Sequence, residues 1–330
     1  MRLRMGLVIG VVLLLLLTLT GCNRQESRPT ERAADEGPWV FERRIEIMIP
    51  VSLGGGFDNT LRAFQPYLEQ ELGQTIVIDA RPGGSGVIGM TYSFSAPRDG
   101  YHFQGIAPTP IISAAQDMFS VPIMDHIVPV TGLLQTEGMI FANPNVPFND
   151  LDGMLRYVRA NPGRVSISLD SPTGTAGVLL TMFAEQMGID IRWIVGGGDE
   201  NRIDTISGNA DLLHATWNET AAYVHSGDLI PIAILADRRN PIIPDVPAVS
   251  EIGVNLTIGF FRIFTAMSGT PQGAIDAFEA AVHRAVRHEG WQRWLLDNGI
   301  SPDYVFTQEE LGVVIRDTYE QTRDLLSRAR

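Results

Sequence analysis

The sequence contains very little cysteine: Cys22 is the single one in a chain of 330 residues. One cysteine cannot form a disulfide within the chain, so the folded part must be stabilised by its hydrophobic core. The six histidines are scattered, and none pairs with another at H-x-x-x-H spacing or with a cysteine. This pattern gives a metal site little support, and we expect neither a metal nor a cofactor.

Positive charge is also scarce. The chain has 25 lysines and arginines against 38 aspartates and glutamates, for a net charge of −13. This balance argues against nucleic acid as a partner and against attraction to an acidic membrane surface. If the ligand is an anion, it must therefore be held by local N–H dipoles and short-range contacts.

The chain begins with a hydrophobic run that is short for a membrane span. Arg2 and Arg4 precede residues 7–17, which are nearly all Leu, Val and Ile. A span needs about 20 apolar residues, so the run is typical of a secretory signal. It ends in LTGC, which resembles a bacterial lipobox and makes Cys22 the lipidated residue and membrane anchor. A single-pass signal anchor is the alternative. Residues 23–40 are polar and predict a flexible tether.

A glycine loop follows the first predicted strand. Residues 45–49 alternate between isoleucine and other side chains, as in a β-strand, and Gly54, Gly55 and Gly56 then precede a helical pattern that includes Asp58. A helix N-terminus has unpaired N–H groups and a dipole that favours negative charge, so the loop predicts an anion site. Alternatively, the glycines only turn the chain, and Asp58 or Asn59 caps the helix.

A second loop of the same kind lies one strand and helix further on. Residues 75–78 form a β-branched run, and RPGGSGVIG follows at 81–89. Two such loops would meet at the carboxyl edge of a parallel sheet, where α/β proteins bind ligands. Gly84, Gly86 and Gly89 match G-x-G-x-x-G spacing only as a lone motif, and neither loop has the lysine of a P-loop. The surroundings of Ser85 also differ from a G-x-S-x-G nucleophile elbow.

These segments resemble a known family. PVSLGGGFD at 50–58, RPGGSGVIG at 81–89, APRDGY at 96–101 and PDVPAVSEIG at 244–253 are similar to motifs of the substrate-binding receptors of tripartite tricarboxylate transporters, the Bug family. The resemblance extends from about residue 45 to the C-terminus. It implies a two-lobed α/β fold of the periplasmic-binding-protein type II class, with helices flanking a sheet in each lobe. It also implies a carboxylate ligand in a cleft between the lobes.

The expected second lobe repeats the strand, loop and helix order at 165–187. The resemblance implies that the hydroxyls and amides of the loop at 170–177 hold the ligand from the other side. Val178 stands near the position where the family often has histidine. Residues 212–220 also depart from the family pattern and place Thr216, Trp217, Asn218 and Glu219 at the cleft.

The expected organisation is a signal at 1–22, a tether at 23–40, one lobe at 41–142 plus 256–330, and the other at 143–255. The predicted ligand-binding residues come from the loops of both lobes: Ser52, Gly54, Gly55, Gly56, Asp58, Gly83, Gly84, Ser85, Gly86, Thr109, Ser171, Thr173, Gly174, Thr175, Thr216 and Asn218. Four arginines near these segments are interpreted as structural ion pairs or surface charges: Arg62, Arg81, Arg192 and Arg262. Arg262 and Ile263 also depart from the family, which has an aromatic residue and a glycine near there.

The preferred function is that of a monomeric, lipid-anchored receptor in the cell envelope, which binds a small carboxylate and delivers it to the permease subunits of a tripartite transporter. A sensory binding protein that reports to a signalling partner is the second hypothesis. A secreted enzyme with Asp58 or Glu219 as general base is the third. It is disfavoured, and no catalytic residue is assigned, because no recognisable motif supplies a nucleophile or an acid–base pair.

Overall fold

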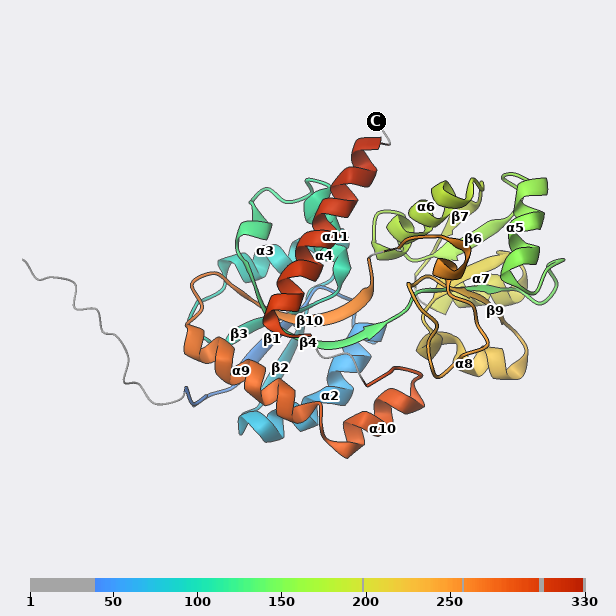
Figure 1. Cartoon of the computed structure of the whole chain (residues 1–330). Coiled ribbons are helices and arrows are strands. Elements are labelled where there is room, and N and C mark those ends of the chain that lie inside the picture. Colours follow the sequence, from blue (N-terminus) through green and yellow to red (C-terminus); the bar gives the residue numbers. More distant parts are fainter. Residues whose placement is uncertain (1–38, 198, 257, 303–305, 329–330) are drawn as a thin grey trace, which may run out of the picture. The chain divides into compact units, whose positions relative to one another are not determined.

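The computed structural model describes residues 39–197, 199–256, 258–302 and 306–328. Cys22 and the rest of the predicted signal lie outside the described residues. Within the described part, the strands form two five-stranded sheets, each flanked by helices (Figure 1). The predicted two-lobed α/β fold is confirmed.

The first sheet has the strand order β2-β1-β3-β10-β4. Its strands are β1 (Ile45–Ile49), β2 (Ile76–Ala80), β3 (His102–Ile106), β4 (Ile127–Thr136) and β10 (Phe260–Met267). β1 is parallel to β2 and β3, whereas β10 is antiparallel to β3 and β4. Because Ile263 pairs with Ile106, β10 begins at the edge where β1, β2 and β3 end.

Helices cover both faces of this sheet. One face carries α2 (Gly56–Leu72), α9 (Gln272–Ala285) and α10 (Glu289–Asp297); the other carries α3 (Val87–Ser95), α4 (Pro108–Ala115) and α11 (Gln308–Arg328). β1 shows how the sequence achieves this. Ile45, Ile47 and Ile49 point into the core with α2 and α9, while Met48 points into the opposite core. Burial on both faces is typical of parallel strands.

The second sheet has the order β7-β6-β8-β5-β9. Its strands are β5 (Met139–Ala142), β6 (Ser166–Leu169), β7 (Arg192–Val195), β8 (Leu212–Ala215) and β9 (Ile230–Ile234). α5 (Leu151–Ala160) and α6 (Thr175–Met187) pack on one face, and α7 (Asp199–Ser207) and α8 (Trp217–Ser226) on the other. Three short 3-10 helices complete the described elements: η1 (Gly84–Gly86), η2 (Ile123–Asp125) and η3 (Val249–Ile252).

The start of α5 illustrates how a local signal becomes structure. Asp150 directly precedes the helix, and its side chain accepts a hydrogen bond from Gly153 N at 2.6 Å. Leu151, Met154, Leu155 and Val158 then repeat at helical spacing and are buried in the second core. The cap therefore fixes where the helix begins, and the apolar stripe fixes how it packs.

Strand pairing differs from the predicted lobe limits near residue 140. The sequence places 139–142 with the first lobe, but β5 pairs with β8 and β9 of the second sheet. The chain therefore leaves the first sheet after Thr136, and residues 137–138 form the crossover. The reason is that a four-residue apolar strand fits either sheet equally well. Leu256 and Ile258, also placed with the first lobe, pack in the second core.

Candidate functional site

Three loops and the start of one strand meet at the carboxyl edge of the first sheet. The loops after β1, β2 and β3 emerge there because these strands are parallel, and α2, η1 and α4 begin directly after them. β10 reaches the same edge with its first residues because it is antiparallel. Ligands of α/β proteins bind at this kind of edge. The candidate residues of the first lobe are therefore gathered there, as their positions after strands predict.

The first glycine loop holds its shape with its own hydrogen bonds. Gly54 N donates to Asp58 Oδ2 at 2.8 Å, and Gly55 N donates to Ser52 O at 3.2 Å. The N–H groups of Gly54 and Gly55 are thus engaged within the loop. Those of Gly56, Phe57 and Asp58 have no acceptor in the described part of the chain, and no side chain caps α2. The α2 N-terminus therefore presents three N–H groups and the positive end of the helix dipole.

Asp58 is a buried carboxylate, 2% exposed, whose partners are its own loop and the next turn of α2. Arg62 Nε donates to Oδ2 at 3.0 Å, and Arg62 Nη2 lies 2.9 Å from Oδ1. Burial works to raise the pKa of Asp58, but the hydrogen bonds from Arg62 and Gly54 outweigh burial and lower it. Asp58 therefore remains ionised and stabilises the loop from inside.

The second glycine loop has an unusual backbone. Gly83, Gly84, Ser85 and Gly86 have φ angles of 117°, 56°, 51° and 90°, so four consecutive residues lie in the left-handed half of conformational space. At Gly86 a Cβ would lie 2.7 Å from Pro110 Cγ of α4, a distance that excludes a side chain. Ser113 Oγ donates to Ser85 O at 2.8 Å and ties the loop to α4. Glycine here allows both the turn and the close packing.

Predicted hydroxyls from the two lobes contact each other directly. Thr109 Oγ1 lies 3.0 Å from Thr175 Oγ1, and Gln116 Nε2 donates to Thr173 O at 3.1 Å. Within the second-lobe loop, Ser171 Oγ lies 3.3 Å from Thr173 Oγ1. Gly174 is the N-cap residue of α6, and no side chain caps this helix. The structure therefore brings the loop after β3 against the loop after β6.

At the start of α8, Thr216 and Glu219 form a capping box. Thr216 N and Thr216 Oγ1 donate to Glu219 Oε2 at 3.0 and 2.7 Å, and Thr216 Oγ1 also lies 2.6 Å from Asn218 Oδ1. These contacts give Thr216 and Asn218 a local structural role. Glu219 Oε1 takes no part in the capping box, and it lies 3.2 Å from the point where a Cβ on Gly56 would be.

Arg262, on β10, also lies beside Gly56. Its environment differs from the one that the sequence analysis expects. Its Nη2 is also 3.2 Å from the Gly56 Cβ position, its side chain is 9% exposed, and its Nε has no hydrogen-bond partner. The interpretation as an ion pair or surface charge is therefore wrong for Arg262. The available signal was a single charged residue in the apolar run FFRIFTAM.

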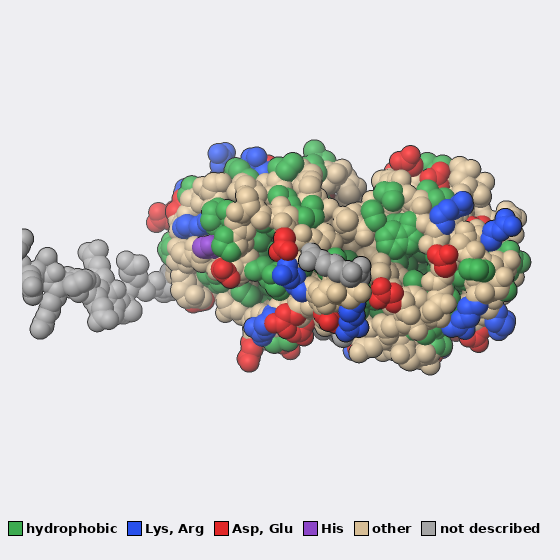
Figure 2. Space-filling view, turned by 90° about the horizontal axis from the view of Figure 1, so that it is seen from above, with side chains coloured by type: hydrophobic (Ala, Val, Ile, Leu, Met, Phe, Trp, Pro, Cys, Tyr) green, Lys and Arg blue, Asp and Glu red, His purple; other side chains and the backbone are tan. Residues whose placement is uncertain are grey.

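The other three arginines occupy ion pairs or the surface. Arg62 pairs with Asp58, as described, and Arg81 Nε lies 2.5 Å from Asp79 Oδ2. The Arg81 guanidinium also covers the Tyr92 ring at 3.4 Å from its centroid. Arg192 is exposed on β7. On the face shown in Figure 2, acidic and basic side chains are dispersed over the surface and do not gather into one patch of a single sign.

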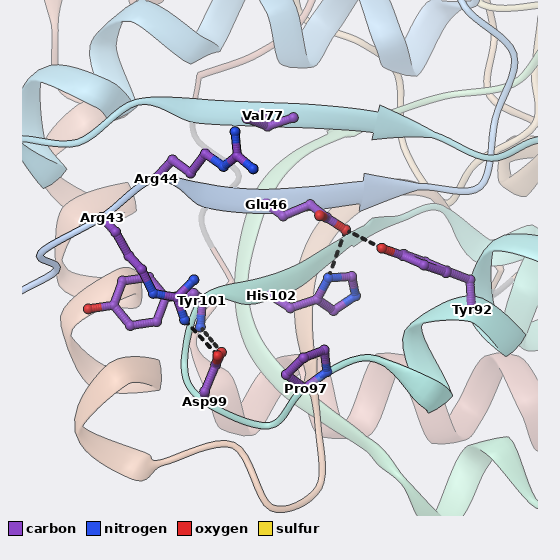
Figure 3. A pocket seen from close by; sticks show the side chains of 9 residues that line it. All are labelled: Arg43, Arg44, Glu46, Val77, Tyr92, Pro97, Asp99, Tyr101 and His102. Carbon is purple, nitrogen blue, oxygen red and sulfur yellow. Dashed lines mark hydrogen bonds and ion pairs between the residues drawn. The ribbon is translucent and has the colours of Figure 1, made fainter.

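A separate pocket of about 250 Å³ lies at the other edge of the first sheet, where β1 and β3 begin. Figure 3 shows that His102 and Tyr92 both contact the Glu46 carboxylate. His102 Nδ1 lies 3.1 Å from Glu46 Oε1, and the Tyr92 hydroxyl donates to the same oxygen at 3.0 Å. His102 Nε2 lies 2.8 Å from Ser93 Oγ, which completes a Ser–His–Glu chain. Ser93 is 0% exposed, however, so no substrate reaches its hydroxyl. Burial lowers the pKa of His102 although Glu46 opposes this effect. The chain of contacts is structural.

Within the described residues, no group of three or more His, Cys, Asp and Glu side chains is arranged to hold a metal ion. Among the helices described, none combines the length and the apolar character that crossing a membrane requires.

Two helix-flanked sheets, with polar loops of both lobes meeting at their edges, define a two-lobed α/β protein. The chain belongs to the tripartite tricarboxylate transporter family of receptors, whose family model matches residues 60–329. The first glycine loop precedes the matched residues. The family and the fold are those of extracytoplasmic solute-binding receptors.

Individual relatives agree with this assignment. Protein BugT of Bordetella pertussis is 27% identical over 215 residues, which are 64% of this chain and 66% of BugT. Among solved structures, the periplasmic binding protein BugD is 22% identical with a TM-score of 0.74, over 88% of this chain and 98% of BugD. MatC from Rhodopseudomonas palustris, solved with bound malate, is 20% identical with a TM-score of 0.74, over 86% and 99%. At these identities, the two structures show the fold.

Proposed function

We propose that this protein is a lipid-anchored extracytoplasmic receptor that captures a small carboxylate and delivers it to the membrane permease of a tripartite transporter. Cys22 is the proposed lipidated residue, and residues 23–40 are the proposed tether. The receptor acts as a monomer.

The observation that carries the proposal is the buried guanidinium of Arg262 beside the uncapped start of α2. Nε of Arg262 has no partner, and the N–H groups of Gly56, Phe57 and Asp58 have no acceptor in the described part of the chain. An unpaired buried charge is costly, and a bound anion removes that cost. Hydrogen bonds to a charged acceptor contribute about 1.5–3 kcal/mol each, so three or four donors suffice for a carboxylate.

The electrostatics of the site favour an anion in spite of the acidic chain. Burial lowers the pKa of Arg262, while the attraction of Glu219 opposes this effect. Burial removes water from around the guanidinium. An anion placed against it supplies a compensating negative charge. The Arg262 guanidinium also lies 5.2 Å from the centroid of the Phe57 ring, which is within the range of a cation–π contact.

The second lobe supports the same ligand class. The hydroxyls of Thr109, Thr173 and Thr175 lie where the loops of the two lobes meet, and α6 has no side-chain cap. Hydroxyls and helix N–H groups both donate to carboxylate oxygens. MatC, which shares the fold, was solved with malate, and malate is a carboxylate.

The test is calorimetry on the full-length protein in detergent with malate, citrate, adipate and L-glutamate as probes. Arg262→Gln and Gly56→Ala should each weaken the tightest-binding probe at least tenfold, which is about 1.4 kcal/mol. The methyl group in Gly56→Ala would lie 3.2 Å from Arg262 Nη2 and from Glu219 Oε1, so both groups must shift slightly, while the backbone at residue 56 needs no strain.

Gly312→Ala is the matched control, because a Cβ at Gly312 of α11 meets no atom within 4 Å. It should bind like the parent protein. If Arg262→Gln and Gly56→Ala remain folded and bind the probe as tightly as the parent, the carboxylate site is not at the α2 N-terminus.

A further inference from the structure

Opposite charges from the two lobes converge on Gly56. Arg262 Nη2 from β10 and Glu219 Oε1 from α8 each lie 3.2 Å from the point where a Gly56 Cβ would be. They are therefore at most twice that distance apart. Glu219 attracts Arg262 electrostatically, but the two side chains form no direct hydrogen bond, and Arg262 Nε has no hydrogen-bond partner. A cation and an anion thus flank Gly56, and a side chain at residue 56 would crowd both of them.

The two carboxylate oxygens of Glu219 have different roles. Oε2 accepts from Thr216 N and Thr216 Oγ1 and thereby caps α8. This anchoring fixes the side chain and leaves Oε1 beside Gly56. The cap uses only Oε2, so Oε1 takes no part in it. Glu219 is therefore positioned as a fixed acceptor for a cationic group.

The neighbouring titratable groups do not change this charge balance. Asp58 is neutralised by Arg62, which hydrogen-bonds to it at 3.0 Å. His214 lies on β8, the strand that precedes α8 and Glu219. It is buried and stacks on Phe260 with ring centroids 5.3 Å apart. Burial lowers the pKa of His214 to about 4, so this histidine is neutral at physiological pH. The charges facing Gly56 are those of Arg262 and Glu219.

We infer that the solute is a zwitterion of the amino-acid type, with a carboxylate on the α2 N-terminus and Arg262, and an ammonium group on Glu219 Oε1. The inference rests on the proposed function, since it specifies the ligand class of the same site. A carboxylate and an ammonium separated by one carbon match two opposite charges that flank one glycine. A ligand with a second carboxylate at this place would face Glu219, and two like charges at such short range repel each other.

The experiment compares amino acids with the same acids lacking the amino group, by calorimetry on the full-length protein in detergent. The pairs are L-aspartate and succinate, L-glutamate and glutarate, L-leucine and 4-methylpentanoate, and L-phenylalanine and 3-phenylpropanoate. In at least one pair the amino acid should bind at least tenfold tighter. Glu219→Gln should remove that preference, because glutamine retains the cap of α8 but carries no charge.

Glu310→Gln is the matched control. Glu310 caps α11 in the same way, since Thr307 N and Thr307 Oγ1 donate to its Oε2 at 2.8 and 3.0 Å. This variant loses one capping carboxylate elsewhere in the chain, and it should retain the full preference for the amino acid. Arg262→Gln should weaken the amino acid and the deaminated acid alike, because both carry the carboxylate.

The outcomes separate the inference from the function on which it rests. If the protein binds deaminated acids as tightly as amino acids, or if Glu219→Gln leaves the preference intact, the zwitterion is wrong and the carboxylate receptor stands. If neither series binds, and mass spectrometry of the purified protein finds no carboxylate released from it, the proposed function itself fails together with the inference.

Discussion

Thr109 Oγ1 of the first lobe and Thr175 Oγ1 of the second lie 3.0 Å apart. Each hydroxyl is at the start of a helix, Thr109 in α4 and Thr175 in α6, and each helix follows a strand of its own sheet. The two residues therefore connect, through one hydrogen bond, the loop edges of the two sheets.

This contact should be measurable as a coupling between the lobes. We expect Thr109→Val and Thr175→Val to be non-additive, with a coupling energy of about 0.5–1.5 kcal/mol in a double-mutant cycle of urea unfolding. Thr181→Val is the control partner, since Thr181 Oγ1 donates within α6 to Gly177 O. Combined with Thr109→Val, it should be additive. Additivity of the first pair would show that the hydroxyl contact does not couple the lobes.

The Asp58 carboxylate should make stability depend on pH. Its pKa is lowered in the folded protein, so its contribution is complete above the ordinary value of an aspartate and is lost as pH falls through the folded value. Asp58→Asn should therefore cost about 1–2 kcal/mol at pH 7, the size of a hydrogen bond to a charged group. The difference from the parent should shrink on acidification below about pH 4.

Urea unfolding at pH 7, 5 and 3.5 measures this dependence. Asp317→Asn is the control because Asp317 is an exposed residue of α11, and its effect should stay within about 0.5 kcal/mol at every pH. A cost of Asp58→Asn that stays constant or grows towards acid pH contradicts the role of the ionised carboxylate in the loop.

Gly86→Ala should destabilise the protein through both backbone and packing. Gly86 has φ +90°, and a Cβ there would lie 2.7 Å from Pro110 Cγ. Gly188→Ala isolates the backbone part, since Gly188 has φ +60° but nothing within 4 Å of its Cβ position. We expect about 1–2 kcal/mol for Gly188→Ala and a further 1–3 kcal/mol, roughly, for Gly86→Ala. Equal losses in thermal or urea unfolding would mean that the contact with α4 is readily relieved.

The predicted anchor is tested by Cys22→Ser. We expect the variant to move from the membrane fraction to the soluble fraction of cells, because the multiply acylated cysteine is the proposed attachment. Binding of the calorimetric probe should be unchanged, since Cys22 lies outside the residues that form the site. Retention of the serine variant in the membrane, with its signal cleaved, would refute the lipobox interpretation.

The strand, loop and helix units could be predicted from the sequence alone. The alternation in 45–49, the glycines at 54–56 and the apolar spacing beyond them each arise within a few residues, so local rules identify them. The parallel arrangement of β1, β2 and β3 then places their loops at one edge. The cap that Asp150 provides for α5 is a local signal of the same kind.

The tertiary structure alone decided which residues face these loops. Arg262 is far from Gly56 in the chain, and it reaches the loop because β10 enters the first sheet antiparallel, with Ile263 opposite Ile106. Glu219 reaches the same point from α8 of the other lobe. The sequence analysis expects Glu219 at the cleft, but it does not predict that Glu219 and Arg262 meet at Gly56. Likewise, the sequence of β5 does not reveal its sheet, and its pairing with β8 and β9 places it in the second one. Local patterns determine elements, but pairing register and packing between distant segments determine the charges of the site.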